Sequence, residues 1–262
     1  MALQPDPSER RRLIGNNTSE VVTLSIADTA NFPLGIWMLG GDDQVTGSTA
    51  NDLVYGNDGE DIINGDLGND SLFGGKGKDL LAGDQGNDFL SGGQDADFFI
   101  GGAGDDILLG GRGNDVLFCG TGNDTLVGGL GRDFLAGLDD NNSSIKIGGS
   151  NLYVLQAEPG VTDFNNADVI VFFRPGADRI GLAGGLTPSD LELQYVTNVT
   201  VLVGFETPEI FKQLIPPGAL NFPPVQSQGT LIKVRNSGDI VGFVAQTRVA
   251  DVQSNMISVQ GF

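Results

Sequence analysis

The chain has 262 residues, enough for one large domain or two small ones. Asp and Glu outnumber Lys and Arg by 34 to 14, and the formal net charge of −20 argues against a nucleic-acid-binding protein, because phosphate binding needs clustered cations. Histidine is absent, which excludes Ser-His-Asp and Cys-His catalysis and HExxH zinc sites. The one cysteine of the chain, Cys119, has no partner for an intramolecular disulfide.

Residues 1–37 are predicted to form a short N-terminal arm that covers one end of the fold. Within it, the alternation of residues 20–26 favours one strand, and we expect Trp37 to lie over the open end. A basic cluster near the start is followed by no apolar run, so we expect no cleaved secretory signal. No apolar run in the chain approaches the roughly 20 residues of a membrane span.

Residues 38–146 are predicted to be one repeat domain, because the sequence from Gly47 onward repeats every nine residues without an insertion. The units begin at Gly47, Gly56, Gly65, Gly74, Gly83, Gly92, Gly101, Gly110, Cys119 and Gly128. The sixth position is always Asp and the eighth is always apolar. A degenerate unit at 38–46 keeps Asp43 and Val45 at those two positions. The candidate metal ligands are therefore Asp43, Asp52, Asp61, Asp70, Asp79, Asp88, Asp97, Asp106, Asp115, Asp124 and Asp133.

Units such as GGKGKDLLA (74–82) and GGRGNDVLF (110–118) resemble the calcium-binding nonapeptide repeat of RTX proteins. The resemblance implies an all-β fold, a right-handed parallel β-roll with two nonapeptides per turn and about five turns. It also implies that the first six residues of each unit form a calcium-binding loop and the last three form a short strand.

The chemistry of these residues agrees with that resemblance. Calcium takes about six to eight oxygen ligands, and carboxylates and backbone carbonyls are its usual donors. Eighteen residues per turn would stack the aspartates in two columns. Neighbouring aspartates within a column would then lie one strand spacing apart, about 4.7–4.9 Å. Neighbouring carboxylates at that spacing repel by about 0.9 kcal/mol even at the dielectric constant of water. Ions between successive loops would remove this repulsion, and the four gaps in each column predict about eight calcium ions.

Some units depart from the glycine pattern, which makes particular calcium sites doubtful. The second glycine is replaced by Ser48, Asn57, Asp66 and Asp84, and the fourth by Ala50 and Asp95. Asp adopts a positive φ more readily than Ala does. We therefore expect the weakest sites in the first unit and around residues 92–100. Cys119 replaces a first-position glycine, and we expect a small buried residue there and not a reactive thiol.

Residues 147–262 are predicted to form a small all-β cap. Residues 161–186 resemble the segment that ends many bacterial RTX arrays. Two hairpins are expected at 191–206 and 229–244, the second turning at 236–238, with a Pro-rich loop at 208–224 between them. A last strand is expected at 254–259, and the final residues are a candidate secretion signal.

The side chains at positions seven and nine should point out of the roll. In the even-numbered units they are almost all apolar, and they are Ile62, Asn64, Leu80, Ala82, Phe98, Ile100, Val116, Phe118, Phe134 and Ala136. The odd-numbered units are more mixed. Because so large an apolar patch is a liability on a monomer, we expect the even face to be covered by the C-terminal cap or by another subunit.

No enzyme motif is present, since GxSxG, GxxxxGK[ST] and the dinucleotide fingerprint are all missing, so we expect no enzyme. The resemblance implies type I secretion to the cell surface or the extracellular space. The leading hypothesis is a secreted structural protein that folds on calcium and self-assembles into a layer, sheath or filament, through the even face or the roll ends. The alternative is a calcium-dependent adhesin or binding module. Ice binding is a minor variant, based on the ladder of Asn51, Asn69, Asn87 and Asn123.

Overall fold

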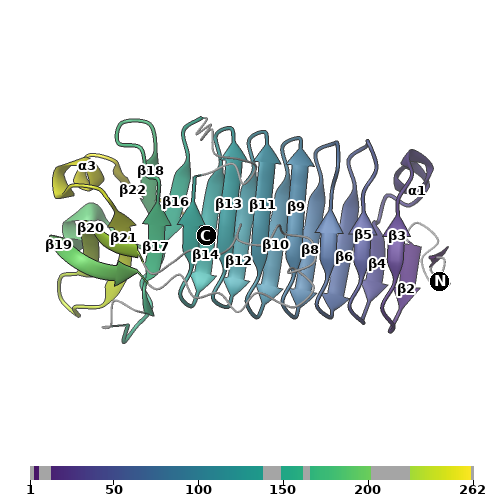
Figure 1. The fold of residues 1–262 in the computed structure, drawn as a ribbon, viewed down its shortest axis with the longest axis horizontal. Helices are drawn as coiled ribbons and strands as arrows, with labels where there is room; N and C mark the ends of the chain where they lie inside the picture. The colour runs from purple at the N-terminus through teal and green to yellow at the C-terminus, as the bar shows by residue number, and fades with distance from the viewer. Residues whose placement is uncertain (1–2, 6–12, 138–148, 162–165, 202–224, 261–262) are drawn as a thin grey trace.

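The computed structural model describes residues 3–5, 13–137, 149–161, 166–201 and 225–260. Their strands form two long sheets, named here sheet A and sheet B, which run together along most of the molecule (Figure 1). The chain alternates between them, so that each turn adds one strand to each sheet, and the repeat strands pair in parallel. The prediction of an all-β parallel roll is confirmed.

Both sheets contain eleven strands. Sheet A has the spatial order β1 (Gln4–Pro5), β2 (Leu13–Asn16), β4 (Ile36–Leu39), β6 (Leu53–Asp58), β8 (Ser71–Lys76), β10 (Phe89–Gln94), β12 (Ile107–Arg112), β14 (Thr125–Leu130), β16 (Leu152–Leu155), β18 (Arg179–Leu182) and β22 (Met256–Ser258). Sheet B has the order β19 (Leu191–Val201), β20 (Val225–Val234), β21 (Ile240–Ala245), β17 (Asp168–Val171), β15 (Phe134–Ala136), β13 (Val116–Thr121), β11 (Phe98–Ala103), β9 (Leu80–Gln85), β7 (Ile62–Asn64), β5 (Gln44–Thr46) and β3 (Val21–Thr23).

Pairing follows the 18-residue register of the sequence, so that Leu90 lies between Leu72 and Leu108. Most repeat strands are six residues long, however, and not the three that were expected. Pairing continues into the first residues of the next unit, as in the pairs Gly93 with Gly111 and Gln94 with Arg112. Backbone groups that leave the strand in an extended conformation keep hydrogen-bonding to the neighbouring turn, which lengthens the strand.

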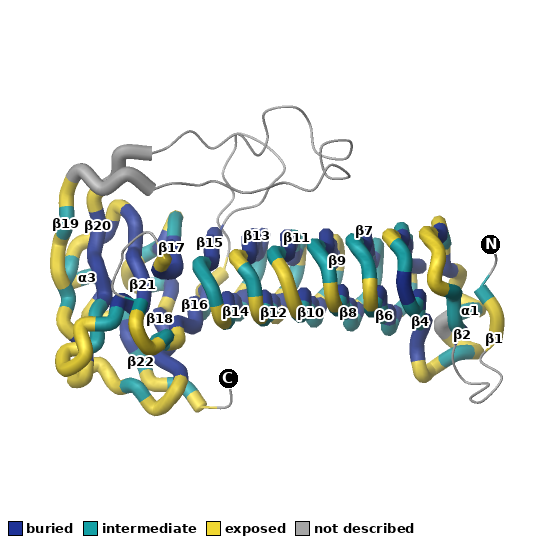
Figure 2. Tube along the Cα trace, turned by 90° about the horizontal axis from the view of Figure 1, so that it is seen from below, coloured by how far each residue is buried: buried dark blue, intermediate teal, exposed yellow. Residues whose placement is uncertain are grey.

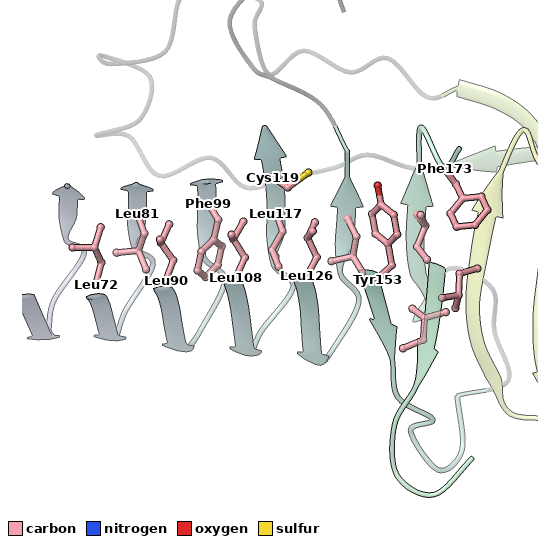
Figure 3. Packing of buried hydrophobic residues seen from close by; sticks show 14 of the residues in the cluster. Leu72, Leu81, Leu90, Phe99, Leu108, Leu117, Cys119, Leu126, Tyr153 and Phe173 are labelled. Carbon is pink, nitrogen blue, oxygen red and sulfur yellow. The ribbon is translucent and has the colours of Figure 1, made fainter. Parts of the chain in front are cut away.

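The eighth-position side chains fill the space between the sheets (Figure 3). All ten are fully buried, and they are Val54, Ile63, Leu72, Leu81, Leu90, Phe99, Leu108, Leu117, Leu126 and Leu135. The row continues past the repeats in Tyr153, Ile170 and Ile180. Burial of one such side chain contributes about 1.5–3 kcal/mol, so this row is the main hydrophobic core of the roll.

The outer faces of the two sheets differ, as the sequence predicts. On sheet B, the apolar seventh- and ninth-position side chains are at most 8% exposed, apart from the partly buried Ile100; they are Ile62, Leu80, Ala82, Phe98, Val116, Phe118, Phe134 and Ala136. We call this set the covered face. It forms one cluster with Val169, Leu231 and Phe243 of the C-terminal strands. Most outward side chains of sheet A are only partly buried (Figure 2).

The N-terminal residues extend both sheets, through β2 and β4 in sheet A and β3 and β5 in sheet B. The strand expected at 20–26 is limited to β3, because Ser25 forms a capping box with Asp28 and starts helix α1 (Ile26–Asn31). The expectation for Trp37 was wrong. Trp37 belongs to β4 and its ring lies 4.8 Å from that of Tyr55, on the side of sheet A and not over its end.

At the other end, β16, β17 and β18 continue the roll before the chain enters the antiparallel strands β19, β20 and β21 (Figure 1). The hairpin expected at 229–244 is confirmed as β20 and β21. The hairpin expected at 191–206 is wrong, because residues 191–201 form one strand that pairs with β20. The final strand is β22, preceded by helix α3 (Val249–Gln253), and a 3₁₀ helix (Pro188–Asp190) precedes β19. The Pro-rich loop at 208–224 lies outside the described residues.

Among the described residues, no helix is long and apolar enough to cross a membrane.

Candidate metal centre

The predicted aspartates stack into two columns, one beside each sheet. The backbone N–H of each Asp donates to Oδ1 of the Asp 18 residues later, over 2.8–3.0 Å. The sheet A column contains Asp52, Asp70, Asp88, Asp106 and Asp124, and the sheet B column contains Asp43, Asp61, Asp79, Asp97, Asp115 and Asp133. All eleven are at most 2% exposed. Each carboxylate therefore ties its turn to the preceding one.

The same hydrogen-bond ladder extends beyond the regular repeats. The additional bonds run from the N–H of Glu20 to Asp43, Asp133 to Asp168, Asp124 to Asn151 and Asn151 to Asp178, over 2.7–3.1 Å. Sequence reasoning missed Glu20, Asn151, Asp168 and Asp178 because insertions break the register, giving spacings of 23, 27 and 35 residues. One feature of the repeat pattern remains in these segments. An Asp or Asn is followed by strand residues in NLYV (151–154), DVIV (168–171) and DRIG (178–181).

The second carboxylate oxygen of the column aspartates, Oδ2, takes no part in this ladder. Oδ2 is buried without any hydrogen-bond partner in Asp43, Asp61, Asp70, Asp79, Asp88, Asp97, Asp106, Asp115, Asp124 and Asp133. Asp52 differs, because its Oδ2 accepts a 2.6 Å bond from the Ser48 N–H. A buried carboxylate oxygen without a donor is strongly destabilising when the group is charged. These oxygens fit a hard cation, which would supply the missing interaction.

Two glycine positions explain how the turns make room for these oxygens. A Cβ at Gly74 would overlap Oδ2 of Asp79 in the same unit. Gly77 has a φ of +116°, and a Cβ there would overlap the carbonyl oxygen of Gly59 in the preceding turn. Where a glycine is replaced by Asn57, Asp66, Asp84 or Asp95, the residue adopts a positive φ of 68–77°, whereas Ser48 and Ala50 of the first unit do not have a positive φ. The glycines therefore preserve the space between stacked turns.

Burial makes these carboxyl groups weak acids in the absence of a metal. It raises the pKa of Asp97 to about 9, and that of Asp79 and of Asp106 to about 8. Repulsion from neighbouring members of the column adds to the effect, as Asp79 and Asp115 do for Asp97. Burial also raises the pKa of Asp168 well above its ordinary value. A divalent cation would relieve both causes.

A second ladder runs through the fifth position, in the opposite direction. The N–H of Asn69, Asn87, Asp105 and Asn123 donates to Oδ1 of the residue 18 positions earlier, over 2.8–2.9 Å. The other edge has equivalent bonds from Glu60 to Asp42 and from Arg132 to Asn114. These side-chain oxygens accept hydrogen bonds within the protein, which accounts for the asparagine ladder noted in the sequence.

Cys119 is fully buried among the core side chains, and its Sγ accepts a 3.3 Å hydrogen bond from Nδ2 of Asn151. Burial raises the pKa of the thiol well above its ordinary value, so little thiolate forms near neutral pH. The residue fills a position in the core.

Within the described part of the chain, no three acidic or cysteine side chains gather closely enough to hold a metal by themselves. Each gap between successive turns is bordered by two carboxylates of one column. Backbone carbonyls of the glycine-rich turns and water are the further oxygen donors that calcium could use there.

The comparison with protein families decides the identity of this region. The family model of the RTX calcium-binding nonapeptide repeat, which describes four copies, matches residues 39–72, 55–90, 73–108, 82–117 and 109–143. Residues 39–143 are RTX calcium-binding nonapeptide repeats. The RTX repeats make this chain a calcium-binding repeat protein, and such repeats are structural elements typical of secreted proteins. No curated protein matches the chain.

Proposed function

We propose that calcium ions bind in the gaps between successive turns, with the sixth-position aspartates as ligands. The observation that carries this proposal is the set of ten buried Oδ2 atoms without a hydrogen-bond partner. Each gap offers two carboxylates, and turn carbonyls complete the coordination of about six to eight oxygens. The ten repeat aspartates border eight gaps, and the pairs Asp43 with Asp61 and Asp133 with Asp168 add one gap at each end of the sheet B column.

The first gap of the sheet A column should be the weakest site. Oδ2 of Asp52 already accepts a hydrogen bond from Ser48, so a metal there competes with a protein donor. The sites around residues 92–100 have no such difference, because Oδ2 of Asp97 is unpartnered and Asp95 adopts the positive φ of the glycine that it replaces.

We infer that folding of the repeats is coupled to calcium. A metal that binds only the folded chain adds its binding free energy to the free energy of unfolding. The RTX repeats then favour a protein that is exported by type I secretion and folds when it meets calcium outside the cell. The experiment is far-UV circular dichroism in calcium and in excess chelator. Loss of the strand signal in chelator supports the proposal, and an unchanged spectrum overturns it.

The function that we favour is a secreted structural protein that self-assembles end to end. The covered face is buried within one chain and has little apolar area for a second subunit. Among the described strands, β3 is the outermost strand of sheet B at the N-terminal end, and its Val21 side chain is 75% exposed. An outermost strand has unpaired backbone groups on one side, and addition of a second roll there would continue the sheet into a filament or layer.

Light scattering and electron microscopy in calcium test the assembly directly. We expect oligomers or filaments of the wild-type protein, and their loss in Val21→Lys, because a charge on an edge strand opposes strand pairing. Ile107→Lys, at a 40% exposed site on sheet A, is the matched control and should still assemble. A wild-type protein that stays monomeric at every concentration would overturn self-assembly.

A calcium-dependent adhesin or binding module is the second candidate, and one observation favours it. The rings of Trp37, Tyr55, Phe73 and Phe89 form a continuous row on the outer face of sheet A, with neighbouring centroids 4.8–5.6 Å apart. All four side chains are partly accessible. Apolar partner surfaces fit such a row. Monodisperse protein that binds a cell surface in calcium, with binding lost in Phe73→Ser, would favour this function over assembly.

A further inference from the structure

Like Asp52, the last carboxylate of the sheet A column, Asp178, has partners for both of its oxygens, but its partners include a guanidinium. Its Oδ1 accepts a 3.0 Å bond from the Asn151 N–H, which continues the ladder. Its Oδ2 accepts a 2.7 Å bond from the Arg174 N–H. The guanidinium of Arg174 adds Nη2 to Oδ1 at 2.7 Å and Nε to Oδ2 at 3.3 Å. Asp178 is fully buried, yet neither oxygen lacks a donor.

The guanidinium also reaches the preceding turn of the same column. Nη2 of Arg174 donates a 2.7 Å bond to the carbonyl oxygen of Gly149. Gly149 stands two residues before Asn151, as Gly122 stands two residues before Asp124 in the repeats. One cation thus joins a carboxylate of one turn to a turn carbonyl of the neighbouring turn. Carboxylate and carbonyl oxygens are the ligand types expected for calcium in the other gaps.

The charges of this gap balance without a metal. In the repeats, two aspartates border each gap, whereas here Asn151 is neutral and only Asp178 carries a negative charge. Arg174 supplies one positive charge. It also stands four residues before Asp178, at the position that is glycine in units such as Gly75 with Asp79 and Gly111 with Asp115. The segment FRPGADRIG (173–181) thus follows the repeat pattern at Gly176, Asp178 and Ile180, with Phe173 and Arg174 in place of the first two glycines.

We propose that Arg174 takes the place of a metal ion in the gap between Asn151 and Asp178, and that this end of the roll is held together without calcium. The inference rests on the proposed calcium sites in the other gaps. A chelator removes ions from those gaps but leaves the guanidinium, which is covalently part of the chain. The sheet A column therefore ends in a turn whose order does not depend on the calcium concentration.

Hydrogen exchange in excess chelator tests the role of Arg174. In the wild-type protein, peptides covering 149–155 and 176–182 should exchange at least about tenfold more slowly than peptides from 65–130. Arg174→Gln should remove that difference, and Arg174→Lys should keep part of it, because the ammonium retains the charge but not the two-sided donor geometry. Equal exchange of 149–155 and 176–182 in the wild-type and Arg174→Gln proteins would overturn the proposal.

Calcium counting provides a gain-of-function test. The double variant Asn151→Asp with Arg174→Gly supplies the second carboxylate and removes the guanidinium, and it should bind one more calcium ion per chain than the wild type in equilibrium dialysis. Arg174→Gly alone is the control and should gain less. An unchanged count in a double variant with wild-type circular dichroism would overturn the proposal. If the wild-type protein binds no calcium, the proposed calcium sites fail, while exchange in Arg174→Gln still reports whether the ion pair orders this turn.

Discussion

The RTX repeats and the last turn of the sheet A column meet the same electrostatic requirement in different ways. Asp97 and its neighbours have an unpartnered buried oxygen, for which we propose calcium from solution as the partner. Asp178 has the guanidinium of Arg174 instead. The two regions share a backbone ladder and one row of core side chains. If both proposals hold, the stability of the repeats depends on the calcium concentration, whereas the stability of the last turn depends only on the chain itself.

The pH dependence of the calcium-free protein should be the largest effect and should be confined to the repeats. Burial raises folded-state pKa values to about 6 for Asp61, about 8 for Asp79 and about 9 for Asp97, against about 3.9 in an unfolded chain. Groups whose pKa rises on folding stabilise the folded state at low pH, and this is lost as pH rises through the folded value. In chelator, stability should therefore fall between about pH 4 and pH 9, by up to about 1.4 kcal/mol per pH unit for each such group.

Thermal unfolding in chelator at pH 5, 6, 7 and 8 measures this effect. In saturating calcium the trend should weaken or reverse, because protons and calcium compete for the same carboxylates. A melting temperature that rises with pH in chelator would contradict the account of the buried aspartates.

Phe98→Glu should have the next largest effect. Phe98 is 5% exposed within the covered face, and a buried, unpaired carboxylate there should lower the free energy of unfolding by at least about 4 kcal/mol. Ile107→Glu, on the outer face of sheet A, is the matched control and should change stability by less than about 1 kcal/mol. Urea denaturation in calcium measures both. Equal losses in the two variants would show that the two faces do not differ in burial.

Asp97→Asn should have a moderate effect whose sign depends on calcium. In calcium it removes a charged ligand from two gaps and should destabilise the protein by about 2–3 kcal/mol. In chelator at pH 7 it replaces a carboxyl group that must take up a proton on folding, while the amide oxygen can still accept the Asp79 N–H, so the free energy of unfolding should rise. Asp178→Asn should destabilise the protein in both media, because Arg174 loses its ion pair. If Asp97→Asn changed the free energy of unfolding in the same direction in calcium and in chelator, the distinction between the repeats and the last turn would be contradicted.

Asn87→Ala should have the smallest effect. It removes the acceptor for the Asp105 N–H in the fifth-position ladder, which should cost about 1 kcal/mol with or without calcium. Asn87→Asp keeps Oδ1 and should lose less stability. A loss that appears only in calcium would instead place this side chain among the metal ligands.

The nonapeptide pattern predicts the strands, the two columns and the inward row, because each of these depends only on the 18-residue register. The register also predicts the covered face, through the apolar residues on both sides of Leu81 and Phe99. The flanking turns could not be predicted in this way. Asn151, Asp168 and Asp178 follow insertions, so their place in the ladders is set by pairing of β16, β17 and β18 with the repeat strands.

The role of Arg174 could not be predicted from the sequence for a related reason. A surface arginine beside an aspartate is ordinary, and its role emerges only when the fold places Gly149 and Asp178 on the same column. The aromatic row of sheet A is another consequence of stacking. Residues Trp37, Tyr55 and Phe73 are 18 positions apart and become neighbours only in the roll.

Hydrogen exchange at pH 8, followed by mass spectrometry before and after chelation, measures whether the order of the repeats depends on calcium. At this pH the repeat carboxylates that lose calcium are driven to ionise in a buried site. The account predicts that peptides from 47–136 lose protection in chelator, that 149–155 and 176–182 keep it, and that added calcium restores the repeats. Protection of 47–136 that is unchanged by chelation would contradict calcium-dependent folding of the repeats.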